Sequence, residues 1–432
     1  MTKTITIFPS KLKSSFPLYA PPSKSHTMRA LLLLSLANGS SKIINYLKSN
    51  DTLAMIETLQ ANGCHITTNK NTLEIIGNPN QWKTPHPYIN AKNSGQIFRF
   101  CTSQAARSSY PITITGDHSI RNNRPIQPLL QALSQLNCTI THLSPPHLVP
   151  FEISGPINPG EISLIGQDSQ IISSLLMVLP FLNKSSIINV VEPGETPWID
   201  LTLYWLKKLG ANIDHYKYTY YHIQGNLSYS GFEVNIPSDF SSMAFLIAIA
   251  ITNNMYIEIN DVDFSDIQGD KKFIDLLITM GAKIQKNFTK KSLKIFPSLN
   301  FLKGVSIDIN PFIDAIPILA VIACFAKGTT KIYNGSIAKN KESNRLKTIT
   351  QELLKMNANI QEMEDGLIIH TSKLSPCKTL YSHNDHRIAM ALIVASLTIL
   401  GESCIKNISC INKSFPDFIN IISSLGGNVI IK

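Results

Sequence analysis

The chain has 432 residues, of which 44% are apolar and 16% charged, a composition typical of a globular protein rather than a disordered or fibrous one. Its formal net charge is +10 at pH 7, but the lysines and arginines are dispersed, and no basic tail or arginine-rich run indicates nucleic-acid binding. We therefore expect two or three domains, small anionic ligands and no nucleic-acid partner.

Cysteine usage and hydropathy favour a cytoplasmic location. The seven cysteines are odd in number and include no Cys-x-x-Cys pair, so we expect free thiols in a reducing compartment. The longest apolar runs are shorter than the ~18 residues needed to span a bilayer, and residues 1–16 lack the apolar region of a signal peptide. We expect no membrane association.

The first strong element is a buried helix in the stretch PPSKSHTMRALLLLSLANG. Two prolines disfavour helix before it, Ser23 or Ser25 can cap its amino terminus, and Gly39 is suited to its end. Lys24, Ser25 and Arg29 place two cations and a hydroxyl where a helix start already favours an anion. The alternative is that Lys24 and Arg29 are ordinary solvated charges beside a core helix. If this stretch is considered alone, that alternative is preferred to an anion site.

Helix ends followed by a strand start recur along the chain. Each contains a glycine or asparagine suited to the left-handed conformation. The marker residues are Gly63, Asn137, Gly210, Gly281, Asn357 and Gly426. Successive markers lie 69 to 76 residues apart, which is too regular for coincidence and long enough for a compact α/β repeat. We therefore expect six copies of one repeat.

Six helices that are apolar on nearly every face form a second series. Their polar starts are marked by Ser25, Ser94, Ser169, Ser241, Asp314 and Asp385, which lie 69 to 75 residues apart. A helix that is apolar all round is buried, so each repeat should contain one buried helix with a polar start and one amphipathic helix. Alternating segments predict strands at 73–76, 112–115, 256–259 and 367–370. Six repeats favour two domains of three, divided near Pro237.

The helix starts of the first half carry cations and neutral donors. Gly95 would let a ligand approach the backbone, and Arg99 follows one turn later. Arg124 precedes a helix that begins with proline. Ser169 and Gln170 offer donors to hydroxyl or phosphate oxygens, although simple capping explains them equally well.

Carboxylates stand at the helix starts of the second half. A negative charge there is favoured by ~0.3 to 1 kcal/mol and often serves only as a cap. We prefer capping for Asp239 and take Asp314 as the better candidate for chemistry. The stretch KESNR would open a further helix with Lys341 and Arg345 on one face at i,i+4, and an exposed ion-paired turn is the alternative.

The segments DHR and KSFPDF add Arg387 and Lys413. The sequence has no Walker loop, dinucleotide-binding fingerprint, HExxH motif or Cys/His cluster. Together the helix starts predict a cation-rich site between two domains that holds a small polyanion. One or two carboxylates would transfer protons, with no metal and no cofactor.

Seven segments carry a resemblance to a known family: PPSKSHTMRALLLLSLANG, NSGQIFR, RPIQPLLQAL, DSQIISSLLMVLP, KESNR, NDHRIAMAL and KSFPDF. In order and spacing they resemble the 5-enolpyruvylshikimate-3-phosphate synthase family along essentially the whole chain. The resemblance implies an inverse α/β barrel-like fold of two domains, each with three βαβαββ repeats whose buried helices point their amino termini into the interdomain cleft. Residues 1–22 and 237–432 would form one domain, and 23–236 the other.

The resemblance also implies a reaction. The enolpyruvyl group of phosphoenolpyruvate would be transferred to the 5-hydroxyl of shikimate 3-phosphate, with release of phosphate, in the shikimate pathway toward chorismate and the aromatic amino acids. Both partners are small molecules, and we expect a cytoplasmic monomer without a cofactor.

Each motif residue takes a role from the resemblance. Shikimate 3-phosphate would be bound by Lys24, Ser25, Arg29, Ser169, Gln170, Asp314 and Lys341. Phosphoenolpyruvate would be bound by Lys24, Gly95, Arg124, Gln170, Arg345, Arg387 and Lys413. Asp314 would be the base toward the 5-hydroxyl and Glu342 the proton carrier at the methylene carbon, with Lys24 and Lys413 as further candidate proton donors.

The chain departs from the family pattern near several motifs. The departures are Gln96, Phe100, Asp168, Glu195, Trp198 and Asn344. An aspartate at position 168, where serine is common, would repel a phosphate unless turned away, and Glu195 stands where a serine often contacts substrate. None of the departures removes a proposed catalytic residue, but they leave open the affinity for shikimate 3-phosphate and the response to glyphosate.

Two alternatives remain at this point. The sister enolpyruvyl transferase acting on UDP-N-acetylglucosamine has asparagine after the first lysine and usually a cysteine in a mobile loop. Here Ser25 follows Lys24, and residues 116–125 contain no cysteine. The other alternative is a non-catalytic anion-binding protein on the same repeat, against which the joint presence of Lys24, Asp314, Glu342 and Arg387 argues.

Overall fold

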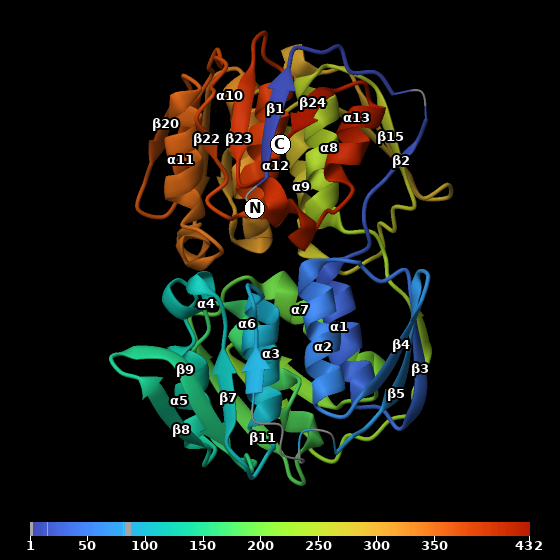
Figure 1. The fold of residues 1–432 in the computed structure, drawn as a ribbon, viewed down its shortest axis with the longest axis vertical. Coiled ribbons are helices and arrows are strands. Elements are labelled where there is room, and N and C mark those ends of the chain that lie inside the picture. The colour runs from blue at the N-terminus through green and yellow to red at the C-terminus, as the bar shows by residue number, and fades with distance from the viewer. Residues whose placement is uncertain (1–2, 15, 81, 83–87) are drawn as a thin grey trace. The chain divides into compact units, whose positions relative to one another are not determined.

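The computed structural model of the chain describes residues 3–14, 16–80, 82 and 88–432. The chain forms two compact units (Figure 1). Unit 1 comprises Met1–Pro22 and Pro237–Lys432, and unit 2 comprises Ser23–Ile236. Each unit has its own hydrophobic core, built from helices and strands together, which confirms the predicted α/β class.

Unit 2 contains most of the first half of the chain. Its elements are α1 (Lys24–Ser35), β3 (Gly39–Ile44), α2 (Asn50–Ala61), β4 (His65–Asn69), β5 (Thr72–Gly77), β6 (Tyr88–Asn90), α3 (Gly95–Ala105), β7 (Ile112–Thr115), α4 (His118–Asn122), α5 (Gln127–Gln135), β8 (Thr139–Ser144), β9 (His147–Ser154), β10 (Glu161–Ile165), α6 (Ser169–Leu176), η2 (Leu179–Phe181), β11 (Ser186–Val191), α7 (Thr196–Lys208), β12 (Ile213–Tyr216), β13 (Tyr220–Ile223) and β14 (Glu233–Asn235).

Unit 1 begins with two strands and resumes after β14. Its elements are β1 (Thr4–Phe8), β2 (Leu18–Tyr19), α8 (Phe240–Thr252), β15 (Ile257–Asn260), η3 (Gly269–Lys271), α9 (Lys272–Thr279), β16 (Lys283–Asn287), β17 (Ser292–Phe296), η4 (Leu299–Phe301), β18 (Ser306–Asp308), η5 (Asn310–Ala315), α10 (Ile316–Phe325), β19 (Thr329–Tyr333), η6 (Ser336–Asn340), α11 (Arg345–Lys355), β20 (Asn359–Glu362), β21 (Leu367–His370), β22 (Leu380–Tyr381), α12 (His386–Leu397), β23 (Ser403–Lys406), η7 (Ile408–Lys413), α13 (Phe418–Ser424) and β24 (Asn428–Ile431).

The described strands form six four-stranded sheets of one topology. The orders are β14-β3-β5-β4, β6-β7-β9-β8 and β10-β11-β13-β12 in unit 2, and β2-β15-β17-β16, β18-β19-β21-β20 and β22-β23-β1-β24 in unit 1. In each sheet the first two strands are parallel and the other neighbours antiparallel. A parallel pair requires a crossover, which α3, α6, α10 and α12 supply directly in four of the sheets.

In the other two sheets, the parallel edge strand does not come directly before the helix that precedes its partner strand. β2 precedes α1 in the chain but pairs with β15, with Leu18 opposite Ile259. β14 precedes α8 but pairs with β3, with Val234 opposite Ile43. In the last sheet, β1 lies between β23 and β24. The two amino-terminal strands therefore attach the start of the chain to unit 1.

The helices predicted to be apolar all round are buried, as expected. Every residue of α8 and of α12 is buried, and α8, α10 and α12 contact one another. Figure 1 shows these helices in the interior of unit 1, and α1, α3 and α6 between the strands of unit 2. Since their side faces are packed, only their ends can present polar groups to a ligand.

The local signals for the repeat are confirmed. All six marker residues have φ between +65° and +106°, the left-handed region that glycine and asparagine tolerate. The predicted strands at 112–115 and 367–370 coincide with β7 and β21, and the other two overlap β5 and β15.

Two predicted helix starts are wrong. α11 begins only at Arg345, because the Asn344 side chain caps it by accepting the Lys347 N–H at 3.1 Å. Lys341 is extended and lies before the helix, so it does not share a helical face with Arg345. Asp314 lies in the short turn η5, two residues before α10 begins at Ile316.

Candidate active site

Arg345 is the centre of a buried charge cluster in unit 1. It is 1% exposed and donates hydrogen bonds to three carboxylates: from Nε to Asp385 Oδ2 at 2.8 Å, from Nη2 to Glu342 Oε2 at 2.7 Å and from Nη1 to Asp314 Oδ1 at 2.5 Å. Burial alone would lower the pKa of Arg345, but the three carboxylates raise it above its ordinary value. Arg345 therefore remains charged.

Asp314 is shared between two arginines. Its Oδ1 accepts from Arg345, and its Oδ2 accepts from Arg387 Nη2 at 2.9 Å. Burial would raise the pKa of Asp314, but the charges of Arg387, Arg345 and Lys341 outweigh burial and hold this pKa well below its usual range. A carboxylate held in this way is a weak base, which becomes stronger if the arginines turn toward another anion.

Glu342 connects Arg345 to Lys413. Its Oε2 accepts from Arg345, and its Oε1 accepts from Lys413 Nζ at 2.7 Å. Glu342 and Lys413 are both buried although they lie 71 positions apart in the chain. A carboxylate and an ammonium in direct contact away from water can pass a proton over a short distance.

Asp385 anchors the start of α12 to this cluster. Its Oδ1 accepts the Arg387 N–H at 2.9 Å as a helix cap, and its Oδ2 accepts both from Arg345 and from the Ser343 hydroxyl at 3.2 Å. The capping role found for Asp385 also holds for Asp239, as predicted, since Asp239 accepts the Ser241 N–H at 2.9 Å at the start of α8.

The turn before α12 depends on a buried acid that sequence reasoning missed. Glu352 of α11 accepts the Tyr381 N–H at 3.0 Å and lies 2.9 Å from His383 Nε2 and 2.7 Å from Lys355 Nζ. Burial would raise the pKa of Glu352, but these hydrogen bonds lower it. His383 and Asn384 both have positive φ, so the turn that presents Arg387 is held in a demanding conformation.

In unit 2, α1 presents Lys24 and Ser25 in its first turn. Ser23 is the cap and accepts the His26 N–H at 3.4 Å. Lys24 Nζ lies 3.5 Å from Oδ2 of Asp51, a buried acid in the first turn of α2. Sequence reasoning missed Asp51, although an acid in the first turn of a helix is a visible signal.

Arg29 points into the interior of unit 2. It is 1% exposed and donates from Nε to Thr202 Oγ1 at 2.9 Å, from Nη2 to the Trp198 carbonyl at 3.1 Å and from Nη1 to the Ser25 carbonyl at 3.2 Å. The guanidinium lies 5.4 Å from the centre of the Phe100 ring, and burial lowers its pKa to about 9. These contacts join α1 to α7, and the role of Arg29 in substrate binding stays a prediction.

Arg99 of α3 organises a second cluster. It is fully buried and donates from Nη1 to Gln170 Oε1 at 3.1 Å and from Nη2 to the Pro125 carbonyl at 2.9 Å. Its Nη2 also lies 2.7 Å from Asp168 Oδ2. Asp168 thus pairs with an arginine and caps α6 through the Gln170 N–H at 3.0 Å, so its charge is compensated within the protein.

Gly95 lies at the centre of the same cluster. A Cβ atom built on it would come within 3.1 Å of Arg99 Nη1, 3.3 Å of Gln170 Oε1 and 3.4 Å of Arg124 Nη1. Three residues predicted to bind phosphoenolpyruvate, namely Gly95, Arg124 and Gln170, are therefore neighbours. A side chain at this position would press on the ends of these three polar side chains, so glycine leaves their arrangement undisturbed.

Glu195 occupies the start of α6. Its Oε2 accepts from the Ser169 hydroxyl at 3.3 Å and from the Ser169 N–H at 3.4 Å, and Glu195 is 2% exposed. Its φ of +47° lies in the left-handed region. A helix start is a favourable site for an anion, and here a protein carboxylate holds that position. A phosphate could reach Ser169 only if Glu195 turned away.

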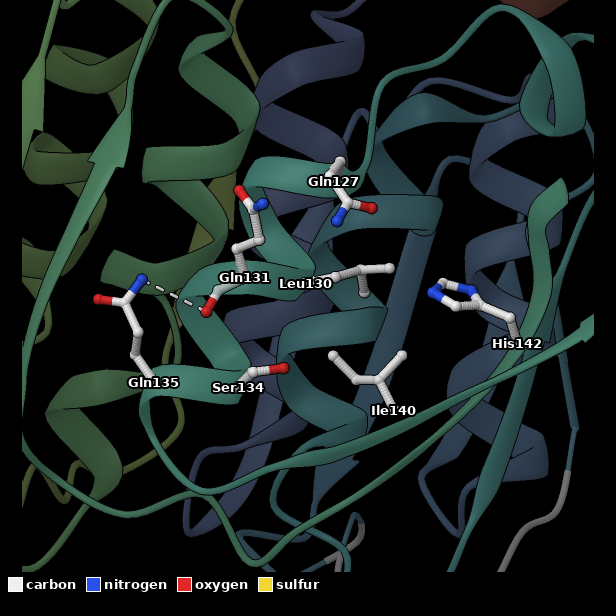
Figure 2. Close-up of a pocket in the computed structure, with 7 residues that line it drawn as sticks. All are labelled: Gln127, Leu130, Gln131, Ser134, Gln135, Ile140 and His142. Carbon is white, nitrogen blue, oxygen red and sulfur yellow. Dashed lines mark hydrogen bonds between the residues drawn. The ribbon is translucent and has the colours of Figure 1, made fainter. Parts of the chain in front are cut away.

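An open groove elsewhere in unit 2 contains none of the predicted site residues. It has a volume of about 620 Å³ and is lined by Gln127, Leu130, Gln131, Ser134, Gln135, Ile140 and His142. Figure 2 shows the Gln135 amide hydrogen-bonded to the Gln131 carbonyl in this groove, at 3.4 Å. It lies on α5 and β8 and offers neither a cation nor a carboxylate, so we do not assign it to the reaction.

Within the described parts of the chain, no group of three or more His, Cys, Asp or Glu residues could hold a metal ion. All seven cysteines are free thiols, as predicted. In these same parts of the chain, no helix is both long and apolar enough to span a membrane.

Comparison with known proteins identifies similar chains. Residues 10–422 match the family model described as EPSP synthase (3-phosphoshikimate 1-carboxyvinyltransferase). The 3-phosphoshikimate 1-carboxyvinyltransferase of Chlamydia felis is 42% identical over 425 residues, covering 98% of this chain and 94% of the relative.

Two solved structures have a similar fold. The EPSP synthase of Acinetobacter baumannii has a TM-score of 0.81 at 22% identity, with all of both chains covered. The enolpyruvyl transferase NikO of Streptomyces tendae has a TM-score of 0.82 at 15% identity, covering 100% of this chain and 99% of that one. At these identities the structures support the fold alone.

Proposed function

The chain belongs to the EPSP synthase (3-phosphoshikimate 1-carboxyvinyltransferase) family, and we propose that the charge clusters of its two units bind and convert the substrates of that reaction. The enzyme transfers the enolpyruvyl group of phosphoenolpyruvate to the 5-hydroxyl of shikimate 3-phosphate, giving 5-enolpyruvylshikimate 3-phosphate and phosphate. The family match thus favours the shikimate substrate over the UDP-sugar considered above. It also argues against a non-catalytic protein.

The reaction makes three physical demands. Two anions must be brought together, which requires cations in a site that excludes water. The methylene carbon of phosphoenolpyruvate must gain a proton, so that an oxocarbenium-like centre can accept the 5-hydroxyl oxygen. The adduct must then lose a proton from the new methyl group and expel phosphate.

Phosphoenolpyruvate would be bound by cations that exchange partners. In unit 1, Arg345 and Arg387 would turn from Asp314 toward the carboxylate and phosphate of the substrate, with Lys413 beside them. The unit 2 residues assigned to the same substrate are Lys24, Gly95, Arg124 and Gln170. Because both arginines are ion-paired with Asp314 before the substrate arrives, the exchange replaces one anion by another and leaves no bare charge.

Asp314 would accept the proton of the 5-hydroxyl. While both arginines hold it, Asp314 is a weak base, and their departure toward phosphoenolpyruvate would raise its basicity. Glu342 would carry the proton to and from the methylene carbon, and Lys413 at 2.7 Å would restore or receive that proton. In this arrangement the binding of one substrate prepares the base for the other.

The second substrate, shikimate 3-phosphate, would be bound by a further set of polar and charged side chains. The assigned residues are Lys24, Ser25, Arg29, Ser169, Gln170, Asp314 and Lys341. Asp168 is compensated by Arg99 and need not repel the phosphate, whereas Glu195 would have to release Ser169. Asp314 is assigned both to binding and to catalysis because a base must contact the hydroxyl that it deprotonates.

One observation carries this proposal. Four separate segments of the sequence contribute to one connected set of ion pairs in unit 1, which joins Arg345, Glu342, Asp314, Arg387 and Lys413. The corresponding test is an assay of phosphate release from phosphoenolpyruvate. Release should occur only when shikimate 3-phosphate is present. Equal turnover with a UDP-sugar, or none with either acceptor, would reject the assignment.

We also propose that the enzyme acts as a monomer in the cytoplasm. Every residue assigned to the substrates belongs to this one chain, and its seven thiols are free, as in proteins of reducing compartments. Light scattering at assay concentration should give the mass of a single chain. A larger mass that persists on dilution would contradict this.

A further inference from the structure

Asp270 is a buried acid that none of the proposed roles uses. It lies in the short turn η3 and is 2% exposed. The Ser241 hydroxyl, in the first turn of α8, donates a short hydrogen bond to its Oδ2. Gln268 fastens the same turn to α8, since its Nε2 donates to the Ser238 carbonyl at 2.9 Å and its Oε1 accepts the Phe240 N–H at 3.2 Å.

No cation compensates this carboxyl directly. Among the described residues, Asp270 forms no ion pair, and its Oδ1 has no hydrogen-bond partner. A buried carboxylate in this state is costly, so the group favours its neutral, protonated form.

The charged groups around Asp270 come from several elements. The turn η3 packs against η5, which contains Asp314, and against α8, which Asp239 caps, and the charge of Arg387 on α12 also acts on Asp270. In its own turn, Lys271 donates to the Asp266 carbonyl at 2.6 Å, and on α9 Lys272 and Asp275 are exposed. Arg387 holds Asp314 through Nη2, while its Nε has no hydrogen-bond partner in the described part of the chain. Asp270 and Asp314 therefore both act on Arg387.

We propose that Asp270 is a positioning residue that sets how strongly Arg387 binds phosphoenolpyruvate, with the protonated carboxyl as the binding-competent form. The inference rests on the proposed assignment of Arg387 to that substrate. An ionised Asp270 attracts Arg387 and competes with the substrate anion, whereas a neutral Asp270 leaves Arg387 to Asp314 and then to the substrate. On ionisation the proton passes to water.

The titration of Asp270 falls in the range that matters for an enzyme. Burial, followed by the charges of Asp314 and Asp239, raises the pKa of Asp270 to about 7, against the opposing effects of Arg387 and Ser241. Near neutral pH the protein is thus a mixture of two forms. In one, Asp270 is neutral and Arg387 can bind the substrate; in the other, Asp270 is ionised and competes with the substrate for Arg387.

The test compares KM for phosphoenolpyruvate between the wild type and Asp270→Asn across pH 6 to 9. Asparagine has nearly the same shape and cannot ionise. Titration of the substrate phosphate is common to both proteins and cancels in the ratio of the two KM values. We expect the wild-type to variant ratio to rise from about 1 at pH 6 to about 10 at pH 9, the size expected for one added charge near a partly screened site. A structural role alone would give a ratio that does not change with pH.

Two further variants keep the inference open to refutation. Ser241→Ala removes a hydrogen bond that favours the ionised form, so its KM profile should shift to higher pH. Asp275→Asn removes an exposed acid on α9 and should leave the profile of the wild type unchanged. A pH-independent ratio for Asp270→Asn would overturn the inference. If Asp270→Asn does not fold, as judged by circular dichroism, a Ser241→Ala variant whose KM profile does not shift with pH relative to the wild type would overturn the inference instead.

Failure of the site assignment itself would look different. If Arg387 does not bind phosphoenolpyruvate, Arg387→Lys leaves its KM unchanged. A raised KM for Arg387→Lys together with a flat Asp270→Asn ratio rejects only the role of Asp270.

Discussion

Replacing Glu342 by glutamine tests the proton-transfer step. The substitution preserves the shape of the side chain but removes its charge and leaves only one oxygen to accept hydrogen bonds. Of the bonds from Lys413 and Arg345, each at 2.7 Å, one is lost and the other keeps a charged donor but loses its charged acceptor. Hydrogen bonds to charged groups contribute about 1.5 to 3 kcal/mol each, so we expect a stability loss of about 2 to 4 kcal/mol. This corresponds to a decrease in Tm of about 10 °C.

The effect on catalysis should be larger than the effect on binding. General acid–base catalysis contributes about 10² to 10⁴ in rate, so kcat for Glu342→Gln should fall by about 10³. KM for both substrates should change by less than about threefold, because the arginines assigned to phosphoenolpyruvate remain. Incorporation of solvent deuterium into the methylene group of phosphoenolpyruvate should slow by a similar factor, since that exchange requires the proton carrier.

The matched control is Glu258→Gln. Glu258 lies on β15 and is partly exposed, with Lys294 at 3.9 Å, so it should keep the kcat of the wild type. All rates are to be compared well below the Tm of each variant, with folding checked by circular dichroism. A kcat of Glu342→Gln within tenfold of the wild type, with unchanged deuterium exchange, would refute the reasoning.

Three further predictions concern stability and substrate binding. The pKa of Asp270 is about 7 in the folded protein and about 4 in the unfolded chain, so the native state binds the proton more tightly and stability falls as pH rises from about 4 to 7. Asp270→Asn should therefore gain up to about 4 kcal/mol relative to the wild type between pH 4 and pH 8, measured by urea unfolding, and an equal difference at both pH values would be contradictory. Asp168→Asn breaks a buried ion pair with Arg99 and should cost about 3 to 5 kcal/mol, or about 10 °C in Tm, whereas a change below 2 °C would show that the pair is not formed. Gly95→Ala places a methyl group 3.1 to 3.4 Å from Arg99, Gln170 and Arg124, so KM for phosphoenolpyruvate should rise about tenfold with little change in Tm, and an unchanged KM would remove Gly95 from the site.

The repeat could be predicted because its signals are local. A left-handed position selects glycine or asparagine through backbone sterics alone, and all six marker residues adopt it. A helix buried on every side must be apolar on every side, and α8 and α12 are. Neither signal depends on a partner far along the chain.

The contacts of the site could not be predicted because they are long-range. Nothing near Arg345 shows that it holds Asp314 and Asp385, which lie 31 and 40 positions away. The pairing of Asp168 with Arg99 could not be predicted from the sequence either. The sequence indicated only that Asp168 would repel a phosphate unless its side chain turned away. Helix starts are ambiguous for a related reason: a side-chain cap such as Asn344 competes with helix formation and moved the start of α11 beyond Lys341.

The sequence predicted a cation-rich site, and the structure shows that these cations are paired with carboxylates of the protein. Arg345 and Lys413 in unit 1, and Arg99 in unit 2, are each buried against carboxylates. A group of bare cations buried at this depth would lose its hydration without compensation, which costs several kcal/mol per ion. Carboxylates remove that desolvation cost in the absence of substrate. They must then compete with the substrate anion for the same cations. With the proposed site assignment, the affinity for phosphoenolpyruvate would be a difference between two anion complexes of the same arginines, and acids such as Asp270 and Asp314 would control it as much as the arginines.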